Sequence, residues 1–265
     1  MLIRSWNLFH GNTSPPQRRG FLDEMIACAT ADSPDVLCVQ EVPAWALDRF
    51  TVGDLASRPP LGTEVGRVLT AAHHGMIRGG IAGQGLGMWL ADASQLTAHY
   101  VHRLNPRGYR ARRARLLGLD RTARWTWAKE ARIVQVVRLR IDGRHLLIAN
   151  THCTGYAGDS RIPDDELLAA ARFTESVARP DDVVVLAGDF NLRAGRSRAL
   201  AVLTGAARRY SAPGPGIDHI LVRDAATSDL RIWPEQRRRG VDGTLLSDHA
   251  PVELEVLTGS ARPQT

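Results

Sequence analysis

The chain of 265 residues is long enough for one large α/β domain or two small ones, and its hydrophobic content of 44% is that of a folded globular protein. No apolar run approaches the length that crosses a bilayer, which argues against a membrane-spanning protein. The three cysteines are widely spaced and lack zinc-ligand spacing, so they favour reduced thiols and a cytoplasmic location over a disulfide framework.

The formal net charge of +6 is concentrated between Arg103 and Arg132. This segment has nine arginines and Lys129, the only lysine, against two acids, so it carries +8 and the rest of the chain −2. Local positive charge is typical of a surface that binds a polyanion, either nucleic acid or an anionic lipid membrane. A solvated arginine-rich face fits as well, because arginine replaces lysine throughout. Trp125 and Trp127 either stack on bases or pack in the interior.

Apolar stretches of strand length alternate with helical patterns from end to end. Because the first residues already form a predicted strand, we expect no cleaved leader. In chain order, the predicted elements are strand Leu2–Leu8, helix Phe21–Ala31, strand Asp35–Gln40, helices Ala44–Ala56 and Leu61–Arg78, strands Leu86–Leu90, Gln95–Leu104, Glu130–Ile141 and His145–Thr151, helix Pro163–Ala178, and strands Asp182–Ala187, Ile217–Val222 and Pro251–Val256.

The pattern predicts an α/β (α+β) domain, because the turn Asp142-Gly143 joins two strands as a hairpin and pure βαβ alternation would not contain one. No internal repeat, low-complexity linker or composition break divides the chain. We therefore expect a single domain over residues 1–258 and a C-terminal tail over 259–265.

Polar residues follow several of the predicted buried strands. At the rim of a sheet such residues can meet a ligand, whereas in its middle they would be unsatisfied. Each segment alone has a structural explanation, such as an Asx-turn, a helix N-terminal acid or a hydrogen-bonded histidine. The segments are Val39-Gln40-Glu41, Asn150-Thr151-His152, Gly188-Asp189-Phe190-Asn191 and Leu246-Ser247-Asp248-His249.

Together with Asn7 and Ile217-Asp218-His219, these segments resemble the endonuclease/exonuclease/phosphatase superfamily, which includes pancreatic deoxyribonuclease, exonuclease III and neutral sphingomyelinases. The likeness runs from Asn7 to about Val256. It implies a four-layer sandwich of two packed mixed β-sheets flanked by helices, with the site at one edge of the sheets.

The resemblance also implies a divalent metal, Mg²⁺ with Mn²⁺ as a possible substitute. A hard cation of this kind takes one or two carboxylates, waters and the substrate phosphate. Glu41 resembles its main ligand, with Asp248 and Asn7 nearby, directly or through water.

The remaining motif residues resemble catalytic groups. Asp189 aligns or activates the attacking water, and Asn191 holds a phosphate oxygen. Asp218 fixes the tautomer of His249, which contacts the scissile phosphate as a base or a charged clamp. His152 resembles the residue that assists the leaving oxygen or the pentacovalent phosphorus opposite the attacking water. Lys129, at the predicted start of a strand, is a further candidate phosphate contact.

These assignments predict a magnesium-dependent phosphoesterase, preferably a phosphodiesterase acting on nucleic acid or nucleotides. A lipid or small-molecule phosphoesterase is the alternative, and a catalytically silent binding module is disfavoured by the complete residue set. Val42-Pro43 stand where apurinic endonucleases have Thr-Lys, which disfavours DNA repair. Substrate choice is expected to lie in loops near residues 53–85, 104–128, 155–163 and 234–246.

Overall fold

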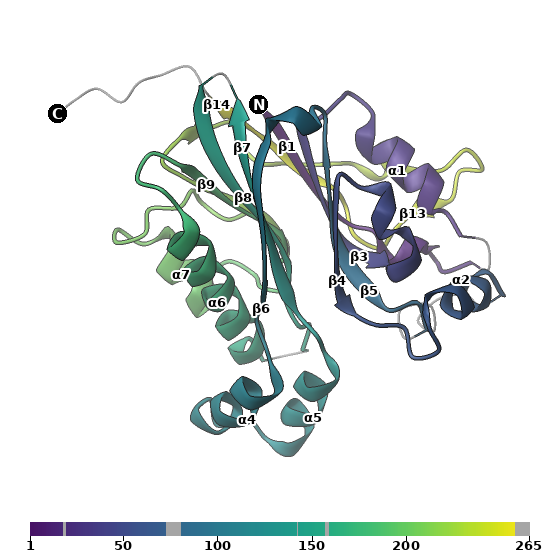
Figure 1. Cartoon of the computed structure of the whole chain (residues 1–265), viewed down its shortest axis with the longest axis horizontal. Coiled ribbons are helices and arrows are strands. Elements are labelled where there is room, and N and C mark those ends of the chain that lie inside the picture. Colours follow the sequence, from purple (N-terminus) through teal and green to yellow (C-terminus); the bar gives the residue numbers. More distant parts are fainter. Residues whose placement is uncertain (18–19, 73–80, 142, 157–158, 258–265) are drawn as a thin grey trace.

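The computed structural model describes residues 1–17, 20–72, 81–141, 143–156 and 159–257. Two main β-sheets pack face to face, and helices cover their outer faces (Figure 1). This arrangement confirms the predicted four-layer α/β sandwich.

The first sheet contains both chain ends of the described region. Its strands run in the order β11-β14-β1-β3-β5-β4, and β12 also pairs with β14. The sheet is mixed, because β1 is parallel to β3 while the other pairs are antiparallel. The bounds are β1 Leu2–Asn7, β3 Val36–Pro43, β4 Val52–Ser57, β5 Gln84–Leu90, β11 Ala226–Thr227, β12 Arg231–Ile232 and β14 Val252–Leu257.

The second sheet has the order β10-β9-β8-β7-β6, and only β8 and β9 are parallel. Its β7–β8 hairpin is the one that the sequence predicts around Gly143. The bounds are β6 Leu96–Arg103, β7 Ile133–Ile141, β8 Arg144–His152, β9 Val183–Asp189 and β10 Asp218–Arg223. A separate two-stranded sheet pairs β2 Thr13–Ser14 with β13 Leu245–Leu246.

The helices pack on the outer faces through their apolar sides. Helix α1 covers the first sheet, and α6 and α7 cover the second, each contributing to one hydrophobic cluster (Figure 1). The helical bounds are α1 Leu22–Thr30, α2 Thr63–Ala72, α4 Arg107–Leu116, α5 Arg121–Lys129, α6 Arg161–Val177 and α7 Arg198–Thr204, with 3₁₀ turns η1 Phe9–Gly11, η2 Ala44–Arg49, η3 Ala93–Gln95 and η4 Glu235–Arg238.

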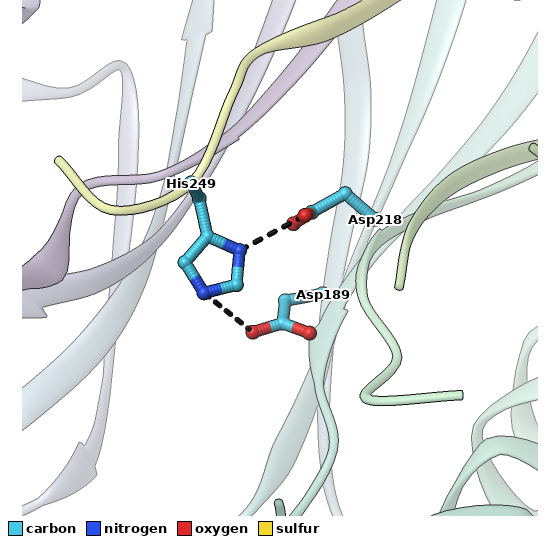
Figure 2. A group of neighbouring side chains, drawn as sticks. All are labelled: Asp189, Asp218 and His249. Carbon is cyan, nitrogen blue, oxygen red and sulfur yellow. Dashed lines mark hydrogen bonds and ion pairs between the residues drawn. The ribbon is translucent and has the colours of Figure 1, made fainter. Parts of the chain in front are cut away.

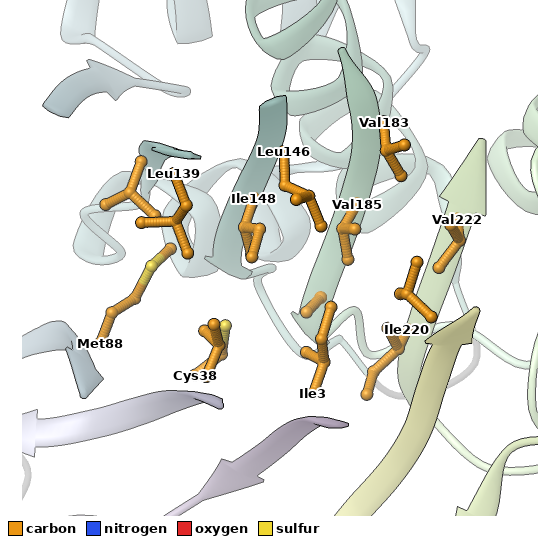
Figure 3. Close-up of a cluster of buried hydrophobic side chains, with 14 of the residues drawn as sticks. Ile3, Cys38, Met88, Leu139, Leu146, Ile148, Val183, Val185, Ile220 and Val222 are labelled. Carbon is orange, nitrogen blue, oxygen red and sulfur yellow. The ribbon is translucent and has the colours of Figure 1, made fainter. Parts of the chain in front are cut away.

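The main core lies between the two sheets (Figure 3). Because successive side chains of a strand point to opposite faces, Leu146 and Ile148 of β8 enter this core, while Leu147 and Ala149 face α6 and α7. Both faces of the central strands are therefore buried, which explains their continuous apolar sequences.

The predicted helix Ala44–Ala56 is wrong. A short 3₁₀ turn ends at Arg49, and Val52–Ser57 forms the edge strand β4 against β5. Strand β4 lies so close to the 3₁₀ turn that only glycine fits at position 53, because a Cβ there would lie 2.2 Å from the carbonyl oxygen of Leu47. Long-range strand pairing has overridden the helical pattern of the sequence.

The helix predicted over 61–78 is α2, Thr63–Ala72; residues 73–78 of that prediction lie outside the described residues. The region around 104–128, expected to be a loop, contains α4 and α5. The strand expected to open at Lys129-Glu130 begins instead at Ile133, because Lys129 is the last residue of α5.

Within the described part of the chain, no helix combines the length and apolarity needed to span a bilayer.

Candidate active site

The polar segments that follow the strands meet at one edge of the two sheets. His152, at the end of β8, is in register with Asp189 at the end of β9. Asp189 is in turn in register with Asp218 at the start of β10. In the first sheet, Asn7 ends β1 beside Gln40 of the parallel strand β3, one residue before Glu41. Strand pairing therefore places side chains that are distant in sequence around one point.

Amide side chains form hydrogen bonds between the two sheets, both in this site and deeper in the core. The Nδ2 atom of Asn7 donates to Asp189 Oδ2 at 3.0 Å and lies 3.3 Å from Glu41 Oε1. Deeper in the core, Gln40 Nε2 donates to Asn150 Oδ1 at 2.8 Å, and Asn150 Nδ2 donates to the carbonyl oxygen of Val39 at 3.0 Å. These buried hydrogen bonds fix the distance between the sheets where the chemistry is expected.

Several residues at the same place have a strained backbone. Glu41, Asn191 and Ser247 have positive φ angles of 53°, 52° and 57°, and Glu41 lies where the β3–β5 register shifts. Gly188 has a φ of 142°, and a Cβ on it would lie 1.8 Å from the carbonyl oxygen of Thr151. The Gly-Asp-Phe-Asn motif therefore needs glycine at its first position, where β9 approaches β8 closely. Residues with a strained backbone, such as Glu41, Asn191 and Ser247, are typical of functional sites.

An Asp–His–Asp arrangement lies at the centre of the site (Figure 2). The Nδ1 atom of His249 is 2.9 Å from Asp218 Oδ2, and its Nε2 atom is 3.8 Å from Asp189 Oδ2. Burial lowers the pKa of His249, but the hydrogen bond to Asp218 and the charges of Asp189 and Asp218 outweigh it and raise the pKa to about 10. His249 is thus held as a cation between two carboxylates.

Asp189 is buried and lies next to other acids. Burial and the charge of Asp218 raise the pKa of Asp189, although His249 and the hydrogen bond from Asn7 act in the opposite direction. The backbone N–H of Asn191 donates to Asp189 Oδ1 at 2.9 Å, and Asn191 Nδ2 donates to the carbonyl oxygen of Cys153 at 2.9 Å. These contacts orient both side chains of the Asp-Phe-Asn segment.

His10 is a site residue that the sequence did not indicate. Its Nε2 atom lies 3.0 Å from Glu41 Oε2. Burial raises the pKa of Glu41, but the charge and hydrogen bond of His10, with the charge of Arg132, hold that pKa well below its usual range. His10 lies in the 3₁₀ turn directly after β1, so its only sequence signal is its closeness to Asn7.

Arg132 is a second site residue that the sequence did not indicate, and it contacts the ring of His152 on the side of Nδ1. Its Nη1 atom is 2.8 Å from His152 Nδ1, while His152 Nε2 is 3.5 Å from Asp189 Oδ2 and 3.8 Å from Glu41 Oε1. Burial and the charge of Arg132 lower the pKa of His152. The two histidines of the site therefore have opposite electrostatic surroundings, as is common for groups with different roles.

Two predicted site residues are exposed. Asp248 Oδ1 is 4.0 Å from His249 Nε2, and its side chain is 46% exposed. Lys129, proposed as a phosphate contact, has its ammonium group 3.0 Å from the centre of the Trp125 ring on helix α5.

The acids of the site fit a hard divalent cation. Ligand atoms of Asp189, Asp218 and His249 lie within 4.8 Å of one another, and Glu41 is joined to Asp189 through Asn7. The Oδ1 atom of Asp218 is buried and, among the described residues, has no hydrogen-bond partner. Burial and the charges of Glu41 and Asp218 raise the pKa of Asp248, although His249 acts in the opposite direction, and a cation bound beside Glu41 and Asp248 would relieve the repulsion between these carboxylates.

A surface groove of about 490 Å³ begins beside Asn191. It is lined in part by Tyr156, Arg193 and Arg196, and both arginines are exposed. Two arginine side chains, which can donate hydrogen bonds to a phosphate, thus line a groove next to the Asp–His–Asp arrangement.

Comparisons with known proteins agree with this geometry. Residues 5–249 match the model of the Endonuclease/Exonuclease/phosphatase family. A comparison with curated protein sequences finds no significant match.

Three solved structures illustrate the likeness in fold, each aligned over 97% of this chain. A functionally unknown conserved protein from Enterococcus faecalis V583 has a TM-score of 0.61 and 15% identity over 99% of its length. D. rerio TDP2 complexed with a single-strand DNA product has a TM-score of 0.59 and 15% identity over 99% of its length. The human Nocturnin catalytic domain with a bound sulfate anion has a TM-score of 0.57 and 16% identity over 93% of its length. The chain therefore belongs to the endonuclease/exonuclease/phosphatase family.

Proposed function

We propose that the chain is a magnesium-dependent phosphodiesterase that hydrolyses nucleic acid or nucleotide substrates. Enzymes of the family generally use divalent metal ions and act on phosphate esters. The observation that carries the proposal is the Asp218–His249–Asp189 arrangement, which holds a cationic imidazole and a carboxylate side by side at the edge of the sheets.

Glu41, Asp248 and Asn7 would hold the ion, which is Mg²⁺ with Mn²⁺ as a substitute. When bound, it would supply positive charge at a phosphate oxygen and lower the pKa of a coordinated water. Glu41 and Asp248 offer carboxylate oxygens, as this class of cation requires. Asn7 lies beside Glu41, and its amide oxygen accepts from the N–H of Phe9, so it would act near the ion directly or through water.

The chain's own residues divide the remaining work. Asp189, held by Asn7 and the backbone of Asn191, is placed to accept a hydrogen bond from the attacking water and orient it. His249 presents a cationic N–H to the phosphate, where negative charge develops in the transition state. Asn191 Nδ2 donates one hydrogen to the carbonyl oxygen of Cys153, and its other hydrogen can be donated to a phosphate oxygen. His152 lies on the other side of the site, where it can assist the departure of the leaving oxygen.

The helices α4 and α5, here called the basic helix pair, support a nucleic-acid substrate. Trp127 is buried and donates to Glu166 Oε1 at 2.6 Å, so this tryptophan packs in the interior. Trp125 is 61% exposed, with Lys129 over its ring. An exposed aromatic ring among cations is typical of single-strand binding surfaces. The TDP2 structure with a single-strand DNA product points in the same direction.

Only some arginines of the pair are available for a polyanion. Arg110 donates to the carbonyl oxygens of Trp127, Ala128 and Glu130 at 2.8–2.9 Å, and so caps the end of α5. Arg113 pairs with the buried Asp165 at 2.6 Å. These two arginines stabilise the fold, and replacing them would not test binding.

By contrast, three arginines are exposed and, among the described residues, make no side-chain hydrogen bond or ion pair: Arg107, Arg112 and Arg121. Replacing all three with glutamine should weaken binding to single-stranded DNA and RNA. If each contacts one phosphate, the slope of log K against log salt should fall by about 2, since each contact contributes roughly 0.7. Fluorescence anisotropy over a salt series measures both quantities.

A matched control is Arg140→Gln/Arg144→Gln/Arg179→Gln, because these arginines lie at the opposite edge of the second sheet, where β7 ends and β8 and β9 begin. This control should bind like the wild type. Equal salt slopes for all three proteins would contradict a role of the basic helix pair.

A substrate screen with Mg²⁺ and Mn²⁺ tests the reaction class. It should include single- and double-stranded DNA, RNA, bis(p-nitrophenyl) phosphate, a phosphomonoester and sphingomyelin. We expect hydrolysis of the diesters and of nucleic acid. Turnover of sphingomyelin, with binding to anionic vesicles and none to nucleic acid, would establish the lipid alternative, and absence of all turnover would leave the binding module.

A further inference from the structure

A buried arginine fixes the orientation of one catalytic-site histidine. Arg132 and His152 are both 6% exposed, and Arg132 Nη1 lies 2.8 Å from His152 Nδ1. Nothing in the motif pattern assigns a role to Arg132, because it lies outside the segments that follow the strands.

The chemistry of the two groups decides where the ring proton lies. A guanidinium group has N–H donors and no acceptor, and it stays protonated in proteins. The hydrogen bond therefore requires a lone pair on His152 Nδ1, which leaves the ring proton on Nε2. This Nε2 atom is the one that faces Asp189 and Glu41.

Arg132 is itself held from three sides. Its backbone N–H donates to Asn105 Oδ1 at 3.0 Å, its Nη2 atom lies 2.8 Å from Glu130 Oε2, and its Nε atom lies 3.4 Å from Thr154 Oγ1. The guanidinium plane thus has little freedom to turn away from the imidazole of His152.

We propose that Arg132 is a positioning residue that keeps His152 as the neutral Nε2–H tautomer, so that its ring can only donate a hydrogen bond to the substrate phosphate. The phosphate contact rests on the proposed function, whereas the tautomer does not. His249 has the opposite arrangement, because its Nδ1 atom faces the carboxylate of Asp218. Of these two histidines, His249 is therefore the one with the cationic role.

The test compares Arg132→Met, which removes the donor, with Arg132→Lys, which retains one. Glu130→Gln is the matched control, because it removes the ion-pair partner of Arg132 and leaves the contact with His152. The ¹⁵N NMR shifts of the ring, assigned with a His152→Gln variant, report the tautomer in metal-free protein. We expect an unprotonated Nδ1 and a protonated Nε2 in the wild type, Arg132→Lys and Glu130→Gln.

In Arg132→Met we expect a protonated Nδ1 to appear. With bis(p-nitrophenyl) phosphate, kcat should fall about tenfold to a hundredfold, KM should change little, and Arg132→Lys should recover most of the loss. A protonated Nδ1 in the wild type would overturn the proposal whether or not Arg132→Met folds. So would an Arg132→Met variant that folds and keeps both the wild-type tautomer and kcat.

A protein that hydrolyses no diester but shows the expected tautomers would refute the proposed function and leave the tautomer assignment standing. Thermal unfolding of each variant separates loss of the fold from loss of positioning.

Discussion

Replacing Glu41 with glutamine is expected to remove Mg²⁺-dependent phosphodiester hydrolysis while the protein stays folded. Glutamine keeps the shape and the hydrogen bond to Asn7 but removes the negative charge that would hold the cation. A bound metal stabilises the transition state by several kcal/mol, so kcat/KM should fall roughly 10³-fold. Hydrolysis of bis(p-nitrophenyl) phosphate over a Mg²⁺ titration measures the loss.

Glu255→Gln is a suitable control for this variant, because Glu255 is a half-exposed residue of β14 whose side-chain contact is with Arg231 at 3.7 Å. It should titrate with Mg²⁺ as the wild type does. If Glu41→Gln shows the same turnover and the same Mg²⁺ dependence as this control, Glu41 is not a metal ligand.

His249→Ala and Asp218→Asn are expected to cause losses that do not add. Asp218 holds the imidazole at 2.9 Å and stabilises its cationic form, so most of its contribution depends on His249. We expect His249→Ala to reduce kcat about 10²- to 10⁴-fold. The double variant should then lie within about threefold of His249→Ala, because residues that act as one unit are strongly non-additive.

The chain contains a second histidine–carboxylate pair that serves as a control. His99 Nε2 lies 2.7 Å from Asp54 Oδ2 on the β4 and β6 edge strands. Gln135 Nε2 also donates to Asp54 Oδ2 at 2.6 Å, and the asparagine of the control keeps an oxygen that can accept this hydrogen bond. His99→Ala/Asp54→Asn should leave kcat unchanged. Additive losses from Asp218→Asn and His249→Ala would show that those two residues act independently.

The residues at the strand ends could be predicted because each motif follows a continuous apolar strand. Val183–Asp189 is buried along its whole length, so its sequence is apolar until the chain reaches the rim, where Asp189 and Asn191 appear. The same logic places Glu41 and His152. Strand order could not be read from these runs, and the family resemblance supplied the sandwich.

Other features depend on contacts that leave no periodic signal. Helix α4 has little apolar surface and is held by Tyr109 and Arg113, which both bind Asp165. The end of α4 and the start of α5 do have local sequence signals: Gly118 has a φ of 62°, and Asp120 caps α5 by accepting from the N–H of Ala123.

His10 and Arg132 enter the site through tertiary contacts alone. His10 lies within a kinked turn, and Arg132 lies between α5 and β7, so neither is part of a motif. Each contact depends on strand pairing within one sheet, because His10 follows β1 and meets Glu41 of β3, while Arg132 precedes β7 and meets His152 of β8. Sequence patterns therefore indicated the groups expected to react, and the fold revealed the groups that adjust them.

The most direct measurement is the hydrolysis of bis(p-nitrophenyl) phosphate by the wild-type protein with Mg²⁺, after removal of metal with EDTA, and after Mg²⁺ is restored. The small diester needs only the site itself, so the result does not depend on how a larger substrate binds. We predict turnover with Mg²⁺, its loss in EDTA and its return when Mg²⁺ is added back. Turnover that persists in EDTA, or no turnover with either Mg²⁺ or Mn²⁺, would contradict a metal-dependent phosphodiesterase.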